Sequence, residues 1–254
     1  MRFPNIQHTL ITNGMFLDER WIELFLKVPE FHLVISIESI KKEVYDELRK
    51  GGSLVRLRKN INLLNTLRNK VDNKLKLSMS IIAMKRNYLE IEDIINFALE
   101  NKFYDIMISP LYPNGSEFYD KEYLSPDNDE VQKHFSKISA KIDKEKIVLN
   151  DMFTGQEKKK IRADINSPVN SLKFVDKAIC LAPWQQLFIE VNGEAKSYCH
   201  CTNAIGNLNN NSISEIWNSE KAMKLREDIL NYNYQSCNVA CTEGLLNEID
   251  LKLD

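Results

Sequence analysis

Residues 31–52 read FHLVISIESIKKEVYDELRKGG and contain the pattern that sets the fold. Phe31–Ile37 is a short apolar run of the β-strand type. Lys41–Arg49 follows with a helical pattern, which the pair Gly51-Gly52 interrupts. A strand that leads directly into a helix is half of a βαβ unit, so this stretch predicts parallel strands joined by helices.

The same alternation extends through residues 1–150. We expect strands at His8–Thr12, Phe31–Ile37, Leu75–Ala83, Tyr104–Ser109 and Ile147–Asn150. We expect helices after Asp18, which is a capping residue, over Lys41–Arg49, around Leu57–Leu67 and over Ile91–Glu100. This order predicts right-handed βαβ crossovers in a piece of a β/α barrel or in an open doubly wound sheet. Periodicity alone does not separate these two forms.

The composition is that of a globular protein without an obvious polyanionic or membrane partner. The chain has 254 residues, of which 43% are hydrophobic and 28% are charged, and its formal net charge is −2. This charge gives no reason to expect nucleic acid or an anionic membrane surface as a partner. No apolar run is long enough to span a bilayer, and Met1–Pro4 lacks the layout of a secretory signal. We therefore expect a soluble, cytoplasmic protein.

The last third of the chain has a different pattern. Gln186–Val191 and Glu194–Cys199 are strand-like runs that flank Asn192-Gly193, a pair typical of a hairpin turn. Ser212 and Glu215 form a capping box at the start of one helix, which carries Ile216, Met223, Leu225 and Ile229. We therefore expect a small α+β domain over residues 176–254, joined to residues 1–150 by a polar, lysine-rich linker over residues 151–175.

All five cysteines lie in this last part, at Cys180, Cys199, Cys201, Cys237 and Cys241. In a reducing compartment such a group is more typical of a metal site than of disulfides. The predicted hairpin brings Cys180 near Cys199 or Cys201, so one of these two is surplus to a set of four ligands. Four thiolates fit a four-iron cluster, and they also fit tetrahedral zinc, as do three thiolates with His200. The chain lacks the paired CxxC motifs of zinc ribbons. This makes the zinc interpretation weaker but does not exclude it.

Short motifs run in a fixed order from Cys180 to Cys241. They are Cys180-Leu-Ala-Pro-Trp184, Asn192-Gly193, Cys199-His-Cys201, Gly206-Asn-Leu208, Ile216-Trp-Asn-Ser219, Arg226 and Cys237-xxx-Cys241. In this order they resemble the SPASM domain of radical S-adenosylmethionine (SAM) enzymes. The resemblance implies an auxiliary [4Fe–4S] cluster held by cysteines of this set, with the choice between Cys199 and Cys201 left open.

The front of the chain resembles the later strands of the radical SAM barrel. The matching segments are Leu10-Ile-Thr-Asn-Gly14, Val34-Ile-Ser-Ile-Glu38, Glu43–Arg49 with Gly51-Gly52, Ser80–Asn87 and Asp105–Leu111. The resemblance thus covers nearly the whole chain. It implies an α/β fold, in which a partial parallel (β/α) barrel over residues 1–150 precedes a SPASM-type domain.

The chain departs from the family at the site of the radical chemistry. It contains neither the CxxxCxxC motif, whose three thiolates hold the SAM cluster, nor the GGE element. Both would precede Met1, so we expect an N-terminally truncated relative, in which no catalytic residue is assigned. SAM is then expected as a cofactor only if the missing segment is supplied. Gly193 and Cys199 are also separated by five residues, one more than is common in the family.

The resemblance also implies a set of SAM contacts at the ends of strands. These residues are Thr12, Asn13, Ser36, Glu38 and Arg86, with Leu111 against the adenine. Ligand sites of parallel β/α architectures do lie at the carboxyl ends of their strands. The alternative is that Thr12–Gly14 is only a turn and that Ser36 is only a small residue of a packed barrel.

The resemblance implies radical modification of a peptide or small substrate, for which the chain alone is not competent. The alternative is a non-catalytic module that binds a peptide or another partner and is stabilised by iron–sulfur or by zinc. An unpaired apolar strand at His8–Thr12 is an association hazard. We therefore expect self-association at this edge or pairing with a companion fragment.

Overall fold

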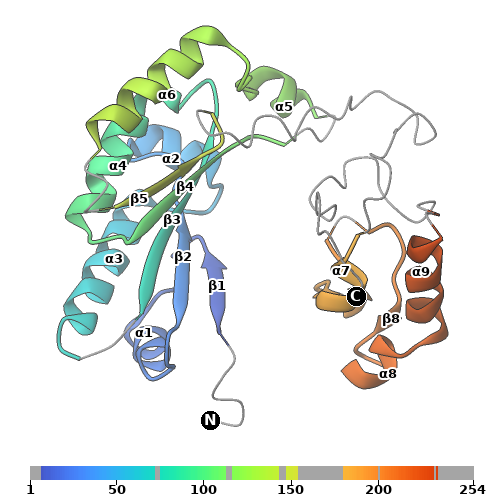
Figure 1. Ribbon diagram of the computed structural model, residues 1–254. Coiled ribbons are helices and arrows are strands. Elements are labelled where there is room, and N and C mark those ends of the chain that lie inside the picture. The colour runs from blue at the N-terminus through green and yellow to red at the C-terminus, as the bar shows by residue number, and fades with distance from the viewer. Residues whose placement is uncertain are drawn as a thin grey trace, which may run out of the picture. The chain divides into compact units, whose positions relative to one another are not determined.

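The computed structural model describes residues 7–71, 75–112, 116–142, 147–153, 180–199, 201–231 and 233. The chain divides into two compact units, Met1–Lys158 and Lys159–Asp254. Each unit has its own sheet (Figure 1). The predicted linker lies outside the described residues from position 154 onward.

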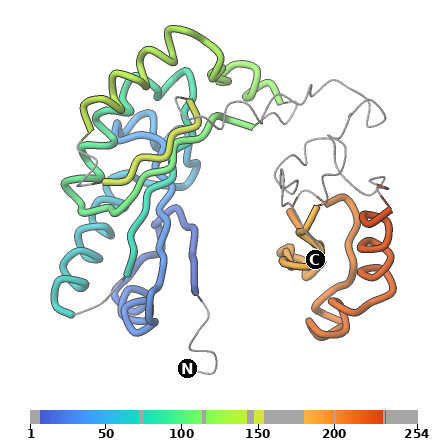
Figure 2. The backbone as a smooth tube through the Cα atoms, viewed as in Figure 1, coloured from blue at the N-terminus to red at the C-terminus, as the bar shows by residue number. Residues whose placement is uncertain are grey.

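A five-stranded parallel sheet forms the centre of the first unit. Its strands are β1 (Thr9–Thr12), β2 (His32–Ser36), β3 (Lys76–Ala83), β4 (Asp105–Pro110) and β5 (Val148–Asp151). They lie side by side in chain order, as the backbone tube in Figure 2 shows. All four pairs of neighbours are parallel, which requires a crossover after each strand. The five strands predicted from the sequence are confirmed, with small differences at their ends.

Helices form the crossovers of this unit. They are α1 (Glu19–Leu26), α2 (Lys42–Leu48), α3 (Leu54–Arg68), α4 (Ile91–Glu100), α5 (Glu117–Glu122) and α6 (Asp129–Lys141), and a 3₁₀ turn, η1 (Tyr88–Glu90), precedes α4. Figure 1 shows α1, α3, α4 and α6 gathered along one side of the sheet. The predicted cap at Asp18 is confirmed, because its side chain accepts from the Trp21 amide. Helices α5 and α6 were not predicted, although Ser116 and Asn128 cap them in the same way.

The core lies between the sheet and these helices. Alternate strand residues such as Leu33, Ile35, Met79, Ile81 and Ile106 are at most 1% exposed and pack with helix residues in one apolar cluster. The residues between them point to the other face of the sheet. That face is more polar and more open, with Ser36 and Ser80 partly exposed and Met107 47% exposed.

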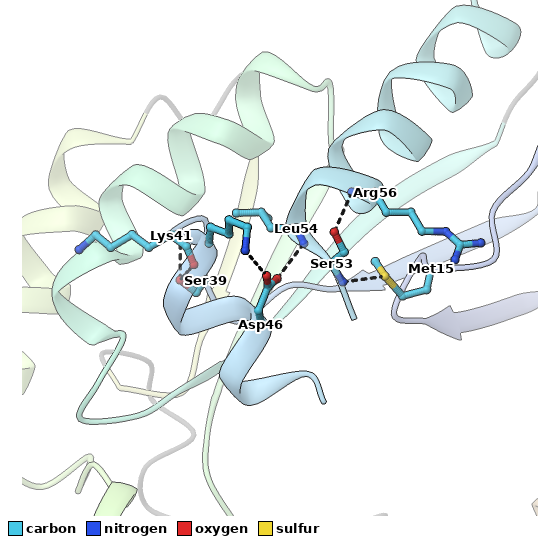
Figure 3. A network of polar contacts seen from close by, with 8 residues as sticks. Met15, Ser39, Lys41, Asp46, Ser53, Leu54 and Arg56 are labelled. Atoms are coloured by element: carbon cyan, nitrogen blue, oxygen red, sulfur yellow. Dashed lines mark hydrogen bonds and ion pairs between the residues drawn. The ribbon is translucent and has the colours of Figure 1, made fainter. Parts of the chain in front are cut away.

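A polar network joins α2, α3 and the turn that follows β1 (Figure 3). The Asp46 carboxylate accepts from the Leu54 amide at 3.1 Å and pairs with Lys42 at 2.7 Å. Ser53 caps α3, and its amide donates to the sulfur of Met15 at 3.3 Å. The network fixes the chain through Gly51-Gly52, which the sequence marked as a break between two helices.

The second unit contains a small antiparallel sheet and short helices. Its strands are β6 (Phe188–Ile189), β7 (Glu194–Lys196) and β8 (Gly206–Asn207), and its helices are α7 (Ala182–Gln185), α8 (Ile213–Trp217) and α9 (Glu220–Leu230). The predicted hairpin is confirmed, with Gly193 at φ +85° in its turn. The capping box of Ser212 and Glu215 is confirmed as well. The fold class, α/β with a small α+β unit, is therefore as expected.

The prediction of one continuous helix after Ser212 is wrong. The helix stops after Trp217, and Ser219 starts α9 by accepting from the Ala222 amide at 3.1 Å. The Ser219 hydroxyl also donates to the Ile205 carbonyl at 3.0 Å, a contact that ties the break to the sheet. The spacing of apolar residues continues across the break, so periodicity did not reveal it. No helix among the described residues is long and apolar enough to cross a bilayer.

Candidate metal centre and the carboxyl edge of the sheet

Cys180 lies at the entrance to α7, in a small apolar cluster of the second unit. Its side chain is buried together with Ala182 and Ile229, and Tyr198 packs against this cluster. Burial raises the pKa of the Cys180 thiol, while a hydrogen bond with the Ala182 backbone opposes this shift. Since Tyr198 directly precedes Cys199, the packing brings the segment of the second and third cysteines up to the first.

The pKa of the Cys201 thiol is raised above its ordinary value. Burial is the main cause that raises the pKa of Cys201, and the nearby Cys180 and Cys199 raise it further. Cys199 is exposed, whereas Cys201 is partly buried. All three thiols are free in the described structure.

The remaining predicted ligands, Cys237 and Cys241, and the alternative ligand His200 lie outside the described residues. Among the residues that are described, no three His, Cys, Asp or Glu side chains converge closely enough to hold one metal ion. The donor chemistry still fits an iron–sulfur cluster. Each thiolate of such a cluster binds a different iron, so neighbouring thiols need not meet at a single point. Burial raises the pKa of the Cys180 and Cys201 thiols, and such buried thiols are stabilised as thiolates when bound cations compensate their charge.

Arg226 of α9 holds the frame of this site together. Its Nε donates to the Pro183 carbonyl of α7 at 3.0 Å, and its Nη1 donates to the Trp217 carbonyl of α8 at 2.8 Å. The guanidinium carbon lies 4.7 Å from the centroid of the Trp217 ring. One side chain thus joins three helices, one of which begins two residues after Cys180. The sequence placed Arg226 in a motif but did not predict these contacts.

In the first unit, the predicted SAM-contact residues lie at or just beyond the carboxyl ends of neighbouring parallel strands. Thr12 ends β1, Ser36 ends β2, Arg86 follows β3, and Leu111 follows β4. Parallel strands end at the same edge of a sheet, so the structure brings these residues to one edge. Asn13 lies in the turn after β1, where its Oδ1 accepts from the Met15 amide at 3.0 Å.

The carboxylate of Glu38 already has a partner within the protein. Arg49 binds it in a bidentate manner, with Nε donating to one oxygen at 2.6 Å and Nη2 donating to the other. Glu38 is 5% exposed, and its backbone carbonyl accepts from Nδ2 of the buried Asn87 at 2.7 Å. Arg49 and Asn87 are therefore site residues that sequence reasoning missed, although both stand within quoted motifs.

Arg86 links the end of β3 to two helices. Its Nη1 contacts Glu47 of α2 at 2.9 Å, and its Nη2 contacts the buried Glu122 of α5 at 2.6 Å. The hydrogen bond with Glu122 is the main cause that raises the pKa of Arg86, and the same bond lowers the pKa of Glu122. One buried atom of each partner, Arg86 Nε and Glu122 Oε2, has no hydrogen-bond partner among the described residues. Glu122 escaped the sequence analysis because its helix was not predicted.

Comparison with known proteins bears on both units. Residues 180–242 match the family model of SPASM, described as an iron–sulfur cluster-binding domain. The chain has no significant match among curated proteins.

Solved structures share the fold at low sequence identity. SuiB of Streptococcus suis bound to S-adenosylmethionine superposes with a TM-score of 0.61 at 16% identity, over 92% of this chain and 54% of that one. SuiB bound to the precursor peptide SuiA gives 0.56 at 17% identity, over 87% of this chain and 50% of that one. The protein anSMEcpe with bound AdoMet gives 0.54 at 15% identity, over 88% of this chain and 57% of that one.

The chain thus spans about half the length of the structures that it matches. At such low identity, the TM-scores show a shared fold and no more. Together with the SPASM match, it confirms the resemblance to radical SAM/SPASM proteins that the sequence motifs gave.

Proposed function

We propose that the second unit binds an auxiliary [4Fe–4S] cluster and that the first unit retains part of a SAM and substrate site. The observation that carries the proposal is the packing of Tyr198 against the cluster of Cys180, which brings the segment of Cys199 and Cys201 up to the first thiol. The SPASM match over the same residues agrees with it. A cluster in this position would anchor a substrate or exchange electrons.

We assign the cluster to Cys180, Cys201, Cys237 and Cys241. Cys201 is preferred to Cys199 because it is partly buried and close to Cys180, whereas the side chain of Cys199 is exposed. Protein ligands of a cluster that is shielded from water are expected to be buried themselves. Cys199 then remains a free thiol at the rim of the site.

The first unit contributes the carboxyl edge of its sheet. Thr12, Ser36 and Leu111 lie along this edge and are the residues that we propose for SAM contacts, together with Asn13. Glu38 and Arg86 belong to the same set, but their contacts with Arg49 and Glu122 point mainly to a role in positioning. Radical chemistry on a peptide would require the SAM cluster from a segment outside these 254 residues.

A peptide is the substrate class that we favour, because SuiB was crystallised with its precursor peptide SuiA. Strand β1 is a further candidate contact. Among the described residues β1 pairs with β2 alone, and Ile11 is 67% exposed. We propose that this edge pairs with another strand, supplied by a second copy or by a companion segment.

Anaerobic reconstitution with iron and sulfide tests the cluster. We expect a brown protein that contains acid-labile sulfide, and Cys201→Ala is expected to lose most of its iron while Cys199→Ala retains it. The two variants are matched controls, because each removes one thiol and the two cysteines are only two positions apart in the chain. A colourless protein that takes up zinc but no sulfide would instead support the zinc-stabilised binding module.

SAM titration tests the first unit separately. The 254-residue chain should bind SAM weakly, and Ser36→Trp at the carboxyl edge should abolish this binding. Val55→Trp, on an exposed position of α3, serves as the control. Absence of SAM binding in a chain that holds its cluster would favour a pure binding module.

A further inference from the structure

We propose that Arg226 provides the counter-charge of the anionic thiol site and thereby raises the reduction potential of its cluster. This inference rests on the proposed function, because it requires that the second unit holds an iron–sulfur cluster. It concerns a residue that touches no thiol in the described structure and acts through its charge and its position.

Arg226 is buried, and among the described residues it has no counter-ion. Its side chain is 8% exposed, and its contacts are with the carbonyls of Pro183 and Trp217 and with the sulfur of Met223. All of these are neutral groups. A buried charge is costly unless an opposite charge lies near it.

The acidic residues next in sequence do not compensate Arg226. Glu227 and Asp228 both pair with Lys224 on the exposed side of α9, each at 3.1 Å. No carboxylate in the described part of the chain forms an ion pair with Arg226. Within the described residues, the positive charge of Arg226 is thus not neutralised by a carboxylate.

The side chain of Arg226 extends toward α7, the helix that follows Cys180. Its Nε donates to the carbonyl of Pro183, which is three residues after Cys180 in the chain. Ile229, one turn further along α9, packs against Cys180 itself. The guanidinium and the first thiol therefore flank the same contact between α7 and α9. Partly buried charges are screened less by salt than exposed ones, so their interaction reaches further.

The charge of Arg226 affects the reduction potential of the proposed cluster. A four-iron cluster with four thiolate ligands carries net negative charge, which becomes more negative by one unit when it accepts an electron. A fixed positive charge nearby stabilises the reduced form more than the oxidised form, and net charge is one of the factors that set cluster potentials. Removing the charge of Arg226 should therefore make the cluster harder to reduce.

Reduction potentials of the reconstituted full-length chain test the proposal, measured by dithionite titration with EPR detection under anaerobic conditions. R226Q removes the charge and should shift the potential to a more negative value. R226K keeps the charge and should remain close to the wild-type value. K224Q removes a charge from the same helix, but Lys224 is 64% exposed and paired with carboxylates, so no shift is expected.

A second pair of variants leaves Arg226 in place, so it does not depend on the folding of R226Q. Met223 is 55% exposed and contacts Nη1 of Arg226 at 3.5 Å. M223E places a carboxylate beside the guanidinium and should shift the potential in the same direction as R226Q. M223Q is its neutral control and should not shift it.

The outcomes separate the charge from simple packing. Unchanged potentials in both R226Q and M223E would overturn the proposal. Equal losses of iron in R226Q and R226K, with no shift in M223E, would also overturn it, because they would show a packing role alone. A wild-type chain that binds neither iron nor sulfide would overturn the proposed function itself, and the inference with it.

Discussion

The two units differ in what holds them together. The first unit buries a continuous apolar cluster that includes residues from β2, β3 and β4 and from most of its helices. The described part of the second unit buries two small clusters, one of Cys180, Ala182 and Ile229 and one of Ala195, Ile205, Ile216 and Ala222. A unit that buries little apolar surface gains correspondingly little stability from its core, and a metal site can supply the rest. The first unit is thus stabilised by its core, and we expect the second to depend on the proposed cluster.

Removal of the metal should have the largest effect, and the effect should be confined to the second unit. We expect chelation of iron in the reconstituted chain to lower the protection of α9 amides by roughly 5–10 kcal/mol, because metal binding and folding are coupled in small metal-dependent domains. Hydrogen exchange followed by mass spectrometry measures this loss. Protection at Met79 and Ile81 of β3 should not change. Protection of α9 that survives complete chelation would contradict the comparison.

Truncation of a core residue in the first unit should destabilise that unit and leave the second unit unaffected. Ile35 of β2 is fully buried against the helices, so Ile35→Ala should destabilise the first unit by about 2–5 kcal/mol. Urea unfolding should give the same loss in the free energy of unfolding with iron and without it. The control is Val55→Ala on α3, where the side chain is 65% exposed and the cost should be small. A cost that depends on iron would show that the units are not independent.

The ion pair of Arg86 and Glu122 gives a pH-dependent prediction within the first unit. The hydrogen bond from Arg86 lowers the folded-state pKa of Glu122 below the ordinary value of 4.5. The stabilisation from this pair is therefore complete above pH 4.5 and is lost as the pH falls through the folded-state pKa.

Glu122→Gln should cost about 1.5–3 kcal/mol at pH 7 and much less at pH 3. Urea unfolding at the two pH values measures the difference. Glu117→Gln, at the start of the same helix, removes a carboxylate for which no ion pair is described. It should show little pH dependence, and an equal cost of Glu122→Gln at both pH values would disprove the linkage.

The smallest predicted effect concerns the break between α8 and α9. Ser219→Ala removes the cap of α9 and the contact with Ile205, and it should cost about 1–2 kcal/mol. Ser214→Ala in α8, an exposed position that does not cap a helix, is the control. The midpoint of thermal unfolding in the cluster-loaded chain measures both. A cost no greater than that of Ser214→Ala would mean that the cap contributes little to the second unit.

Sequence alone was sufficient for the elements that depend on local pattern. The five strands, the Asn192-Gly193 hairpin and the caps at Asp18 and Ser212 were all predicted correctly. The motifs also gave the resemblance to radical SAM/SPASM proteins before any fold was known. These features are encoded within a few neighbouring residues, where side-chain periodicity and capping chemistry act directly.

Tertiary structure alone decided which polar side chains meet. Arg226 reaches a carbonyl 43 positions away, and Arg86 reaches a carboxylate 36 positions away. It also decided that Ser219 breaks a helix whose apolar spacing runs on unchanged. A side chain selects among distant partners only after burial has removed the competing water, so no local pattern records the choice.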